Sequence, residues 1–268
     1  MKLKGLSKYL YVYKTQIIRC FTYKFEVYGN ILMQSIIMIT SAFFWRALYR
    51  TGNPVAGVDV EGMLTYIIIS AMMSVLLITN VERRIENSVQ KGTIAMDMMK
   101  PLNIFGIYLV EDLGSITALV FQNLLPIFLV GSLLVKVPTI CSTEHIPLFA
   151  ISMLMSFFIN WLIAALFGMW SFTAVNVDAL IQVKKHLIRL LSGSIIPMWF
   201  FPDWFRNILE ALPFVYIYQL PLDIYIGKSS GDELAGMMMI QFVWLIILLI
   251  AFAYVARRAT KKVLVQGG

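Results

Sequence analysis

Residues that could carry out chemistry are few in this chain of 268 residues. The run GKSS, from Gly227 to Ser230, resembles the end of a phosphate-binding loop, but Leu222 stands where that loop needs a second glycine. His145 lies four residues after Cys141, but neither His145 nor His186 belongs to a set of cysteine, histidine and acidic residues that would complete a zinc site. The sequence therefore predicts no catalytic residue, no metal site and no nucleotide site: this chain is not an enzyme.

Three charged residues lie inside or beside apolar runs, where burial of a charge is costly. Arg46 lies about one turn from the outer end of its run, so its side chain can extend to the membrane surface. Glu111 and Asp112 begin another run, and we expect them to pair with Arg or Lys from the adjacent loop or the N-terminal helix. For Gln122 and Asn160, helix–helix hydrogen bonds and substrate contacts are equally good explanations.

The composition is that of an integral membrane protein. Of all residues, 59% are hydrophobic and only 14% are charged, whereas soluble domains have about 25% charged residues. A helix needs ~20 apolar residues to cross ~30 Å of hydrocarbon. The apolar runs predict an all-α integral membrane protein with one domain, residues 1–268. Its six spans are expected at about 31–49, 63–79, 113–135, 147–175, within 187–201, and at 236–255.

Lysine and arginine are unevenly distributed between the connecting segments. Seventeen of the 22 lie in residues 1–27, 80–103, 176–189 and 256–268. The positive-inside rule places these segments, and so both termini, in the cytoplasm. The same bias accounts for the net charge of +7 without a nucleic acid partner. It also puts Cys20 and Cys141 on opposite sides of the membrane, so no disulfide is expected.

Residues 1–27 predict an amphipathic helix. Apolar residues recur there at spacings of three and four, opposite a face that carries Lys4, Lys8 and Arg19. A helix of this kind lies in the membrane interface, with its apolar side on the lipid and its basic side toward anionic headgroups.

The loop 80–103 is the largest cytoplasmic feature between spans. Asn80 can cap a helix in which Val81, Ile85 and Val89 form one apolar ridge. A solvated connector is the alternative. We favour a docking surface for another protein, because a solvated loop would avoid the further apolar side chains of this segment. These are Ile94, Met96, Met98 and Met99.

The segment from Ile188 to Gly227 is apolar and aromatic but is repeatedly interrupted by glycine and proline. It is too long for one span and too broken for two. We therefore expect a fifth span that bends at Gly193 and Pro197, followed by a re-entrant helical pair over 202–227. Irregular backbone at that depth must be covered by protein or line a cavity.

Aromatic residues gather in this broken segment. We expect Phe201, Trp204 and Phe214 to lie near an outer gate for an amphiphilic substrate. For any single one of them, an aromatic belt at the outer membrane surface is the simpler explanation.

Two motifs resemble the permease subunits of type-2 ABC exporters, in particular a small six-span branch formerly of unknown function. The loop sequence GTIAMDMMKPLN matches the family pattern at Gly92, Ile94, Asp97, Lys100 and Pro101, with lysine where arginine is commoner. The broken segment matches at Gly193, Pro197, Phe201, Pro202, Trp204, Leu212, Pro213, Phe214, Pro221 and Gly227.

The resemblance implies a multi-pass protein of the bacterial plasma membrane. It implies two separate ABC ATPase subunits and a second permease, identical or related, with the substrate path at the permease interface. The ATPases would bind ATP and Mg, so no cofactor is expected in this chain. Loop 80–103 would hold the coupling helix. We expect the ATPase contacts to involve Val81, Arg83, Arg84, Ile85, Val89, Gly92, Lys100 and Pro101.

An exporter permease has two alternatives. An ATP-independent carrier or channel would use repeat symmetry and polar residues at the membrane midplane, and the sequence has neither. An enzyme that acts on lipid would need His, Asp or Glu clustered at the interface, and the acids here are scattered. The substrate stays open between a peptide, a drug-like amphiphile and a lipid.

Overall fold

All regular secondary structure in the computed structural model is helical over the residues that it describes, 2–22, 24–50, 56–99, 102–135, 144–174, 176–229 and 231–266. The α-helices are α1 (Lys2–Thr22), α2 (Lys24–Leu48), α3 (Val60–Leu76), α4 (Val81–Gln90), α5 (Ile94–Met98), α6 (Ile104–Leu119), α7 (Leu125–Leu134), α8 (His145–Met169), α9 (Asp178–Leu191), α10 (Asp203–Glu210), α11 (Val215–Ile226) and α12 (Gly231–Gln266). A π-helical turn, η1 (Val120–Leu124), joins α6 to α7. Two 3₁₀ turns, η2 (Trp170–Phe172) and η3 (Met198–Phe200), follow α8 and precede α10.

Within the described residues, five helical segments are long and apolar enough to cross a membrane. They are Val27–Leu48, Val60–Gln90, Ile104–Leu134, His145–Phe172 and Gly231–Ala259. These segments overlap the first four predicted spans and the sixth. The prediction of an all-α chain with several membrane-spanning helices is therefore confirmed.

The third predicted span begins earlier than the apolar run suggests. α6 begins at Ile104, so Glu111 and Asp112 lie inside the helix and not at its start. Further along, the helix widens into η1 just before Pro126. Proline lacks the N–H that would continue the helical ladder, and a π-turn is one way to accommodate that loss.

The predicted position of the fifth span is wrong. The helix in this region, α9, begins at Asp178 and ends at Leu191, where the sequence predicted a span within 187–201. Its 14 residues extend about 21 Å at 1.5 Å per residue, less than the ~30 Å of a hydrocarbon core. Gly193 and Pro197 consequently do not bend a helix: both lie in the non-helical stretch that follows α9.

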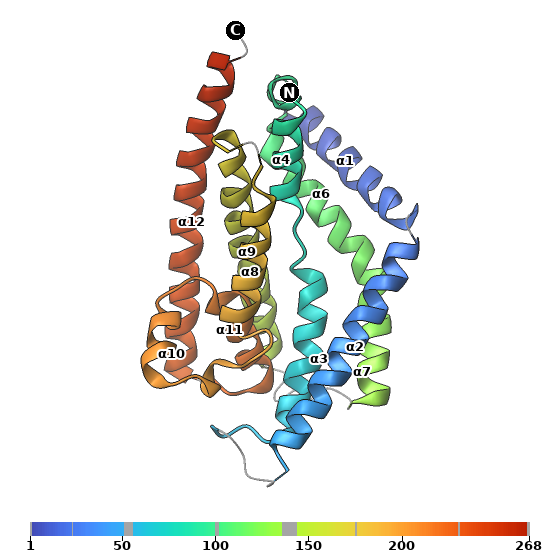
Figure 1. The fold of residues 1–268 in the computed structure, drawn as a ribbon, viewed down its shortest axis with the longest axis vertical. Helices are drawn as coiled ribbons and strands as arrows, with labels where there is room; N and C mark the ends of the chain where they lie inside the picture. The colour runs from blue at the N-terminus through green and yellow to red at the C-terminus, as the bar shows by residue number, and fades with distance from the viewer. Residues whose placement is uncertain are drawn as a thin grey trace.

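The helices form an elongated bundle with two distinct ends (Figure 1). Both chain termini lie at the end that carries α4, and α10 lies at the opposite end (Figure 1). The core between the ends is a continuous apolar cluster from several helices; Met38, Ile68, Ile159 and Ile217 are among its fully buried members.

The N-terminal helix α1 packs along α6 through polar contacts. The Tyr13 hydroxyl lies 2.8 Å from Oγ1 of Thr117, and the buried Gln16 amide donates to Ser115 at 2.9 Å. Leu6 and Ile18 remain exposed. The amphipathic helix predicted for residues 1–27 thus keeps apolar surface outside this chain's own core.

α4 packs against α8 through a close backbone contact. A Cβ atom added at Gly168 would lie 2.6 Å from Cα of Glu82, a backbone atom that cannot rotate away. Only glycine lets the two helices approach this closely. Gly168 is thus the residue of α8 that fixes the position of α4.

We expect Gly168→Ala to lower the free energy of unfolding by about 1–3 kcal/mol, the usual cost of overpacking a close contact. Gly236→Ala is the matched control, because a Cβ there meets nothing within 4 Å. Thermal unfolding of the purified full chain measures both. Equal midpoints for the two variants would contradict the close contact.

Candidate functional site

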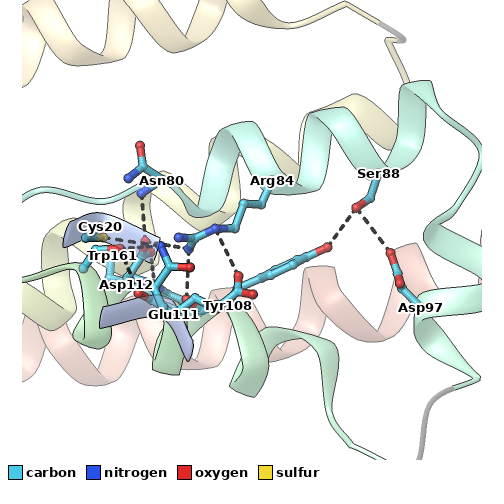
Figure 2. Close-up of polar contacts among 11 residues, drawn as sticks. Cys20, Asn80, Arg84, Ser88, Asp97, Tyr108, Glu111, Asp112 and Trp161 are labelled. Carbon is cyan, nitrogen blue, oxygen red and sulfur yellow. Dashed lines mark hydrogen bonds and ion pairs between the residues drawn. The ribbon is translucent and has the colours of Figure 1, made fainter. Parts of the chain in front are cut away.

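The buried carboxylate of Asp112 connects three helices near the α4 end of the bundle (Figure 2). Its Oδ1 accepts a hydrogen bond from the backbone N–H of Asn80 at 3.2 Å, and its Oδ2 accepts one from the indole N–H of Trp161 at 3.0 Å. Arg84 forms an ion pair with it at 2.6 Å. The side chain of Asp112 is only 1% exposed. Asp112 therefore ties α6 to the start of α4 and to α8.

Arg84 extends this network along α6. Its guanidinium lies 3.1 Å from the Glu111 carboxylate and donates to the carbonyl of Tyr108 at 3.2 Å. The Tyr108 hydroxyl lies 3.1 Å from Ser88, whose hydroxyl also reaches the Asp97 carboxylate at 3.4 Å (Figure 2). The prediction that Glu111 and Asp112 pair with a basic residue of the loop is confirmed.

Two acids on the opposite side of α4 hold α9. Lys184 forms an ion pair with Glu82 at 2.9 Å, with both side chains almost completely buried. One turn further, the Glu86 carboxylate accepts a hydrogen bond from the backbone N–H of Val177 at 2.9 Å. The start of α9 is thus fixed to α4 by a buried charge pair and a backbone contact.

The predicted coupling residues of α4 separate into buried and exposed groups. Val81 and Ile85 are fully buried and Val89 packs against the core. The expectation that this ridge faces another protein is therefore wrong for Val81 and Ile85, because neither reaches the surface. Arg83 is exposed, whereas Arg84 is engaged in the α6 network.

The chain beyond α4 forms an exposed tip. Gly92 is exposed and adopts a φ of 66°, which ends α4 and turns the chain toward α5. On α5 and just after it, Met96 and Met99 are 63% and 83% exposed, while Ile94 is buried. Lys100 and Pro101 lie outside the described residues. The free apolar surface of the loop is thus at Met96 and Met99.

At the other end, the turn after α9 is fixed by one buried amide. A side chain at Gly193, where φ is 84°, would overlap Gln219. The Tyr66 hydroxyl donates toward the Gly193 carbonyl at 2.6 Å and Oε1 of Gln219 at 2.9 Å. Oε1 of Gln219 also accepts from the backbone N–H of Met198 at 3.0 Å. The absence of a side chain at Gly193 therefore allows this turn to approach α11 closely.

Of the aromatic residues assigned to an outer gate, Phe201 and Trp204 both pack against Phe205, whereas Phe214 lies elsewhere. Phe201 stacks edge-on against Phe205 at 5.3 Å and belongs to a small apolar cluster around Leu209. Trp204 is 68% exposed, whereas Phe214 packs against the main core. Among the three, Trp204 alone has a largely exposed side chain.

Sequence reasoning did not find Glu82 and Glu86 as anchors of α9. Their spacing of four residues places both on one face of α4. This spacing is visible in the sequence, but the neighbouring residues do not indicate that the two carboxylates face the interior of the protein. Lys184 was counted as a cytoplasmic surface charge, and its burial follows only from the position of Glu82.

The geometry defines a multi-pass, all-α membrane protein whose polar residues join helices, and the described part of the chain holds no group of three or more His, Cys, Asp or Glu residues that could bind a metal ion. Residues 35–262 match the profile of the ABC-2 family transporter proteins. The chain therefore belongs to this family of transport permeases, as the sequence motifs indicated. No curated protein and no solved structure matches the chain.

We expect Lys184→Met to lower the free energy of unfolding by about 3–5 kcal/mol, because it leaves the Glu82 carboxylate buried without a partner. The double variant Lys184→Met/Glu82→Leu removes both charges and should recover much of the loss. Arg83→Met is the control, since the pair of Arg83 with Asp178 is exposed at 3.7 Å and worth at most about 1 kcal/mol. Denaturant unfolding of the full chain gives all three values; equal losses for Lys184→Met and Arg83→Met would refute the anchoring role.

We expect Tyr66→Phe to loosen the turn after α9, because the Gly193 carbonyl and the Gln219 amide lose the hydroxyl that joins them. Two backbone N–H groups report on this turn: that of Met198, bonded to Gln219, and that of Gln219, bonded to the Ser192 carbonyl. Hydrogen exchange at both should become faster by about 10-fold, as for a loss of about 1–2 kcal/mol. Tyr254→Phe, on the exposed face of α12, should leave both rates unchanged.

Proposed function

We propose that this chain is the membrane-spanning subunit of an ATP-driven ABC exporter. It couples to separate ATP-binding subunits, which bind ATP and Mg, and forms the translocation path together with a second, identical or related permease. This chain binds no cofactor itself. The observation that carries the proposal is the exposed tip of Met96 and Met99, on α5 and just after it. This tip directly follows α4, which is anchored inside the bundle.

The tip has the properties of a docking surface for an ATPase. Met96 and Met99 are large apolar side chains exposed at the end that holds both termini, where the basic segments are concentrated. Methionine is adaptable and common at binding surfaces. By the positive-inside rule this end faces the cytoplasm, the compartment that contains ATP. Arg83, exposed at the start of α4, adds a cation to the same cytoplasmic segment.

The anchoring of α4 supports a mechanical role. A force applied at the tip reaches α6 through Arg84 and Asp112, α8 through the contact of Gly168 with Glu82, and α9 through Lys184. Movement of the ATPases would therefore shift these three helices together. A loose solvated connector would instead absorb the movement.

The arrangement at the far end supports an outward exit for substrate. We propose that α9 and the stretch after it make up the fifth crossing, and that α10 and α11 form a re-entrant pair on the outer side, as expected for 202–227. Exposed Trp204 lies on α10. In this arrangement the chain lies in the bacterial plasma membrane with both termini in the cytoplasm, and α1 rests on membrane lipid.

Co-purification with its ATPase tests the docking tip. The double variant Met96→Asp/Met99→Asp should lower ATPase association at least about 10-fold, because it places charges in an apolar contact. Met96→Leu/Met99→Leu keeps the apolar surface and should associate normally. Unfolding measured alongside separates lost docking from lost structure; a folded aspartate variant that retains its ATPase would contradict the assignment. Ile85→Asp is unsuitable, because Ile85 is buried.

A further inference from the structure

A cavity of about 490 Å³ lies between α2, α3 and α9, with residues of α8 and α11 completing its wall. Its volume is in the ~300–1,000 Å³ range of small-molecule sites. Each of the three helices turns one face toward it. On α2, for example, the wall is formed by residues spaced three and four apart: Asn30, Met33, Gln34, Ile37, Met38 and Ser41.

The charge of the wall is positive. The acid that lines it, Glu82, is neutralised by its ion pair with Lys184 at 2.9 Å. The two other cations of the wall, Lys185 and Arg189, make no ion pair within the described part of the chain. They lie one helical turn apart on α9, so their side chains project on the same side of it. An anion is therefore the charged ligand that this wall attracts.

Several amides and hydroxyls of the wall already have partners within the protein. Gln34 donates to Ser74 at 2.5 Å, and Asn160 donates to the Leu77 carbonyl at 2.7 Å. Ser70 donates to the Ser194 carbonyl at 2.8 Å. A ligand rich in hydroxyls or amides would have to break these bonds. A ligand with a charged head and an apolar body leaves them intact.

The cavity also has a polar end and an apolar end. The pairing of Lys184 with Glu82 places Lys185 near α4, whereas the contact of Ser70 with Ser194 lies beyond the end of α9. The apolar residues Met38, Ile67 and Ile195 also line the wall, and Ile67 and Ile195 are close in sequence to this second contact. A head at Lys185 and Arg189 would therefore leave its apolar body directed away from α4.

We propose that this cavity binds an amphiphile that carries an anionic head group. Lys185 and Arg189 hold the head, and the apolar wall holds the body. The inference rests on the proposed transport function, for which it names the substrate class: an anionic amphiphile taken up at the α4 end. Lys185 and Arg189 set the charge selectivity.

The test is probe binding to the full chain in neutral phosphatidylcholine discs without any ATPase. A dansyl-labelled long-chain carboxylate becomes fluorescent in an apolar site; the matched probe carries an ammonium group in place of the carboxylate. We expect the carboxylate to bind at least about 10-fold more tightly than the ammonium. Removing the cations in Lys185→Gln/Arg189→Gln should weaken carboxylate binding about 10-fold for each charge lost.

Three variants control this result. Arg258→Gln removes an exposed cation outside the cavity and should bind as the wild type does. Lys185→Arg/Arg189→Lys keeps both charges and should also bind, which excludes a merely structural effect. Lys185→Glu/Arg189→Glu should reverse the preference toward the ammonium probe. Equal affinity for the two probes, or no change in the glutamine variant, would overturn the proposal.

Competition separates the two sources of such a ligand. Displacement by phosphatidylglycerol added to the disc would identify a membrane lipid as the ligand. Displacement by dodecyl phosphate alone would identify a free amphiphile, and displacement by neither would overturn the proposal. No ATPase is present in this assay, so a negative result would refute the proposed substrate class alone. The proposed coupling to an ATPase is tested separately by the Met96 and Met99 variants.

Discussion

The contact between α4 and α8 at Gly168 is the constraint on which the arrangement of this end depends. Cα of Glu82 lies against Gly168, and the Glu82 side chain is fully buried. A buried carboxylate must be paired, so Lys184 and with it α9 are drawn to α4. The ion pair contributes little net stability against an apolar pair of the same volume. Its effect is to fix the position of α9.

The position of α9 also determines contacts at the other end of the bundle. Once the start of α9 is fixed, its end at Leu191 brings the following turn against α3, where Tyr66 meets the Gly193 carbonyl. Gln219 then joins the same turn to α11 by two contacts: its N–H donates to the Ser192 carbonyl at 2.9 Å, and its Oε1 accepts from the N–H of Met198 at 3.0 Å. One chain of contacts therefore extends from Gly168 to the segment that begins the outer pair.

The sequence predicted what depends on local properties and missed what depends on partners. Long apolar runs identify α2, α3, α8 and α12 because each run is itself the requirement for crossing a membrane. The fifth span was predicted too far along the chain because the lysines of α9 are typical of a cytoplasmic loop. Lys184 can be buried in this helix only because it pairs with Glu82. The spacing of Val81 and Ile85 gave the correct helix, but periodicity does not tell whether a ridge meets another protein or this chain's own core.

The two ends are also connected by α12, which has 36 residues and is about 54 Å long at 1.5 Å per residue. It packs against α5 near the tip and against α11 near the outer segment, with α8 between them. In the middle, the buried amide of Gln241 donates to the carbonyls of Ser152 and Tyr216, on α8 and α11. A continuous helix held at three points transmits a displacement along its length and does not absorb it. The contacts of α12 therefore give a second connection between α5 and α11, in addition to the one through α9.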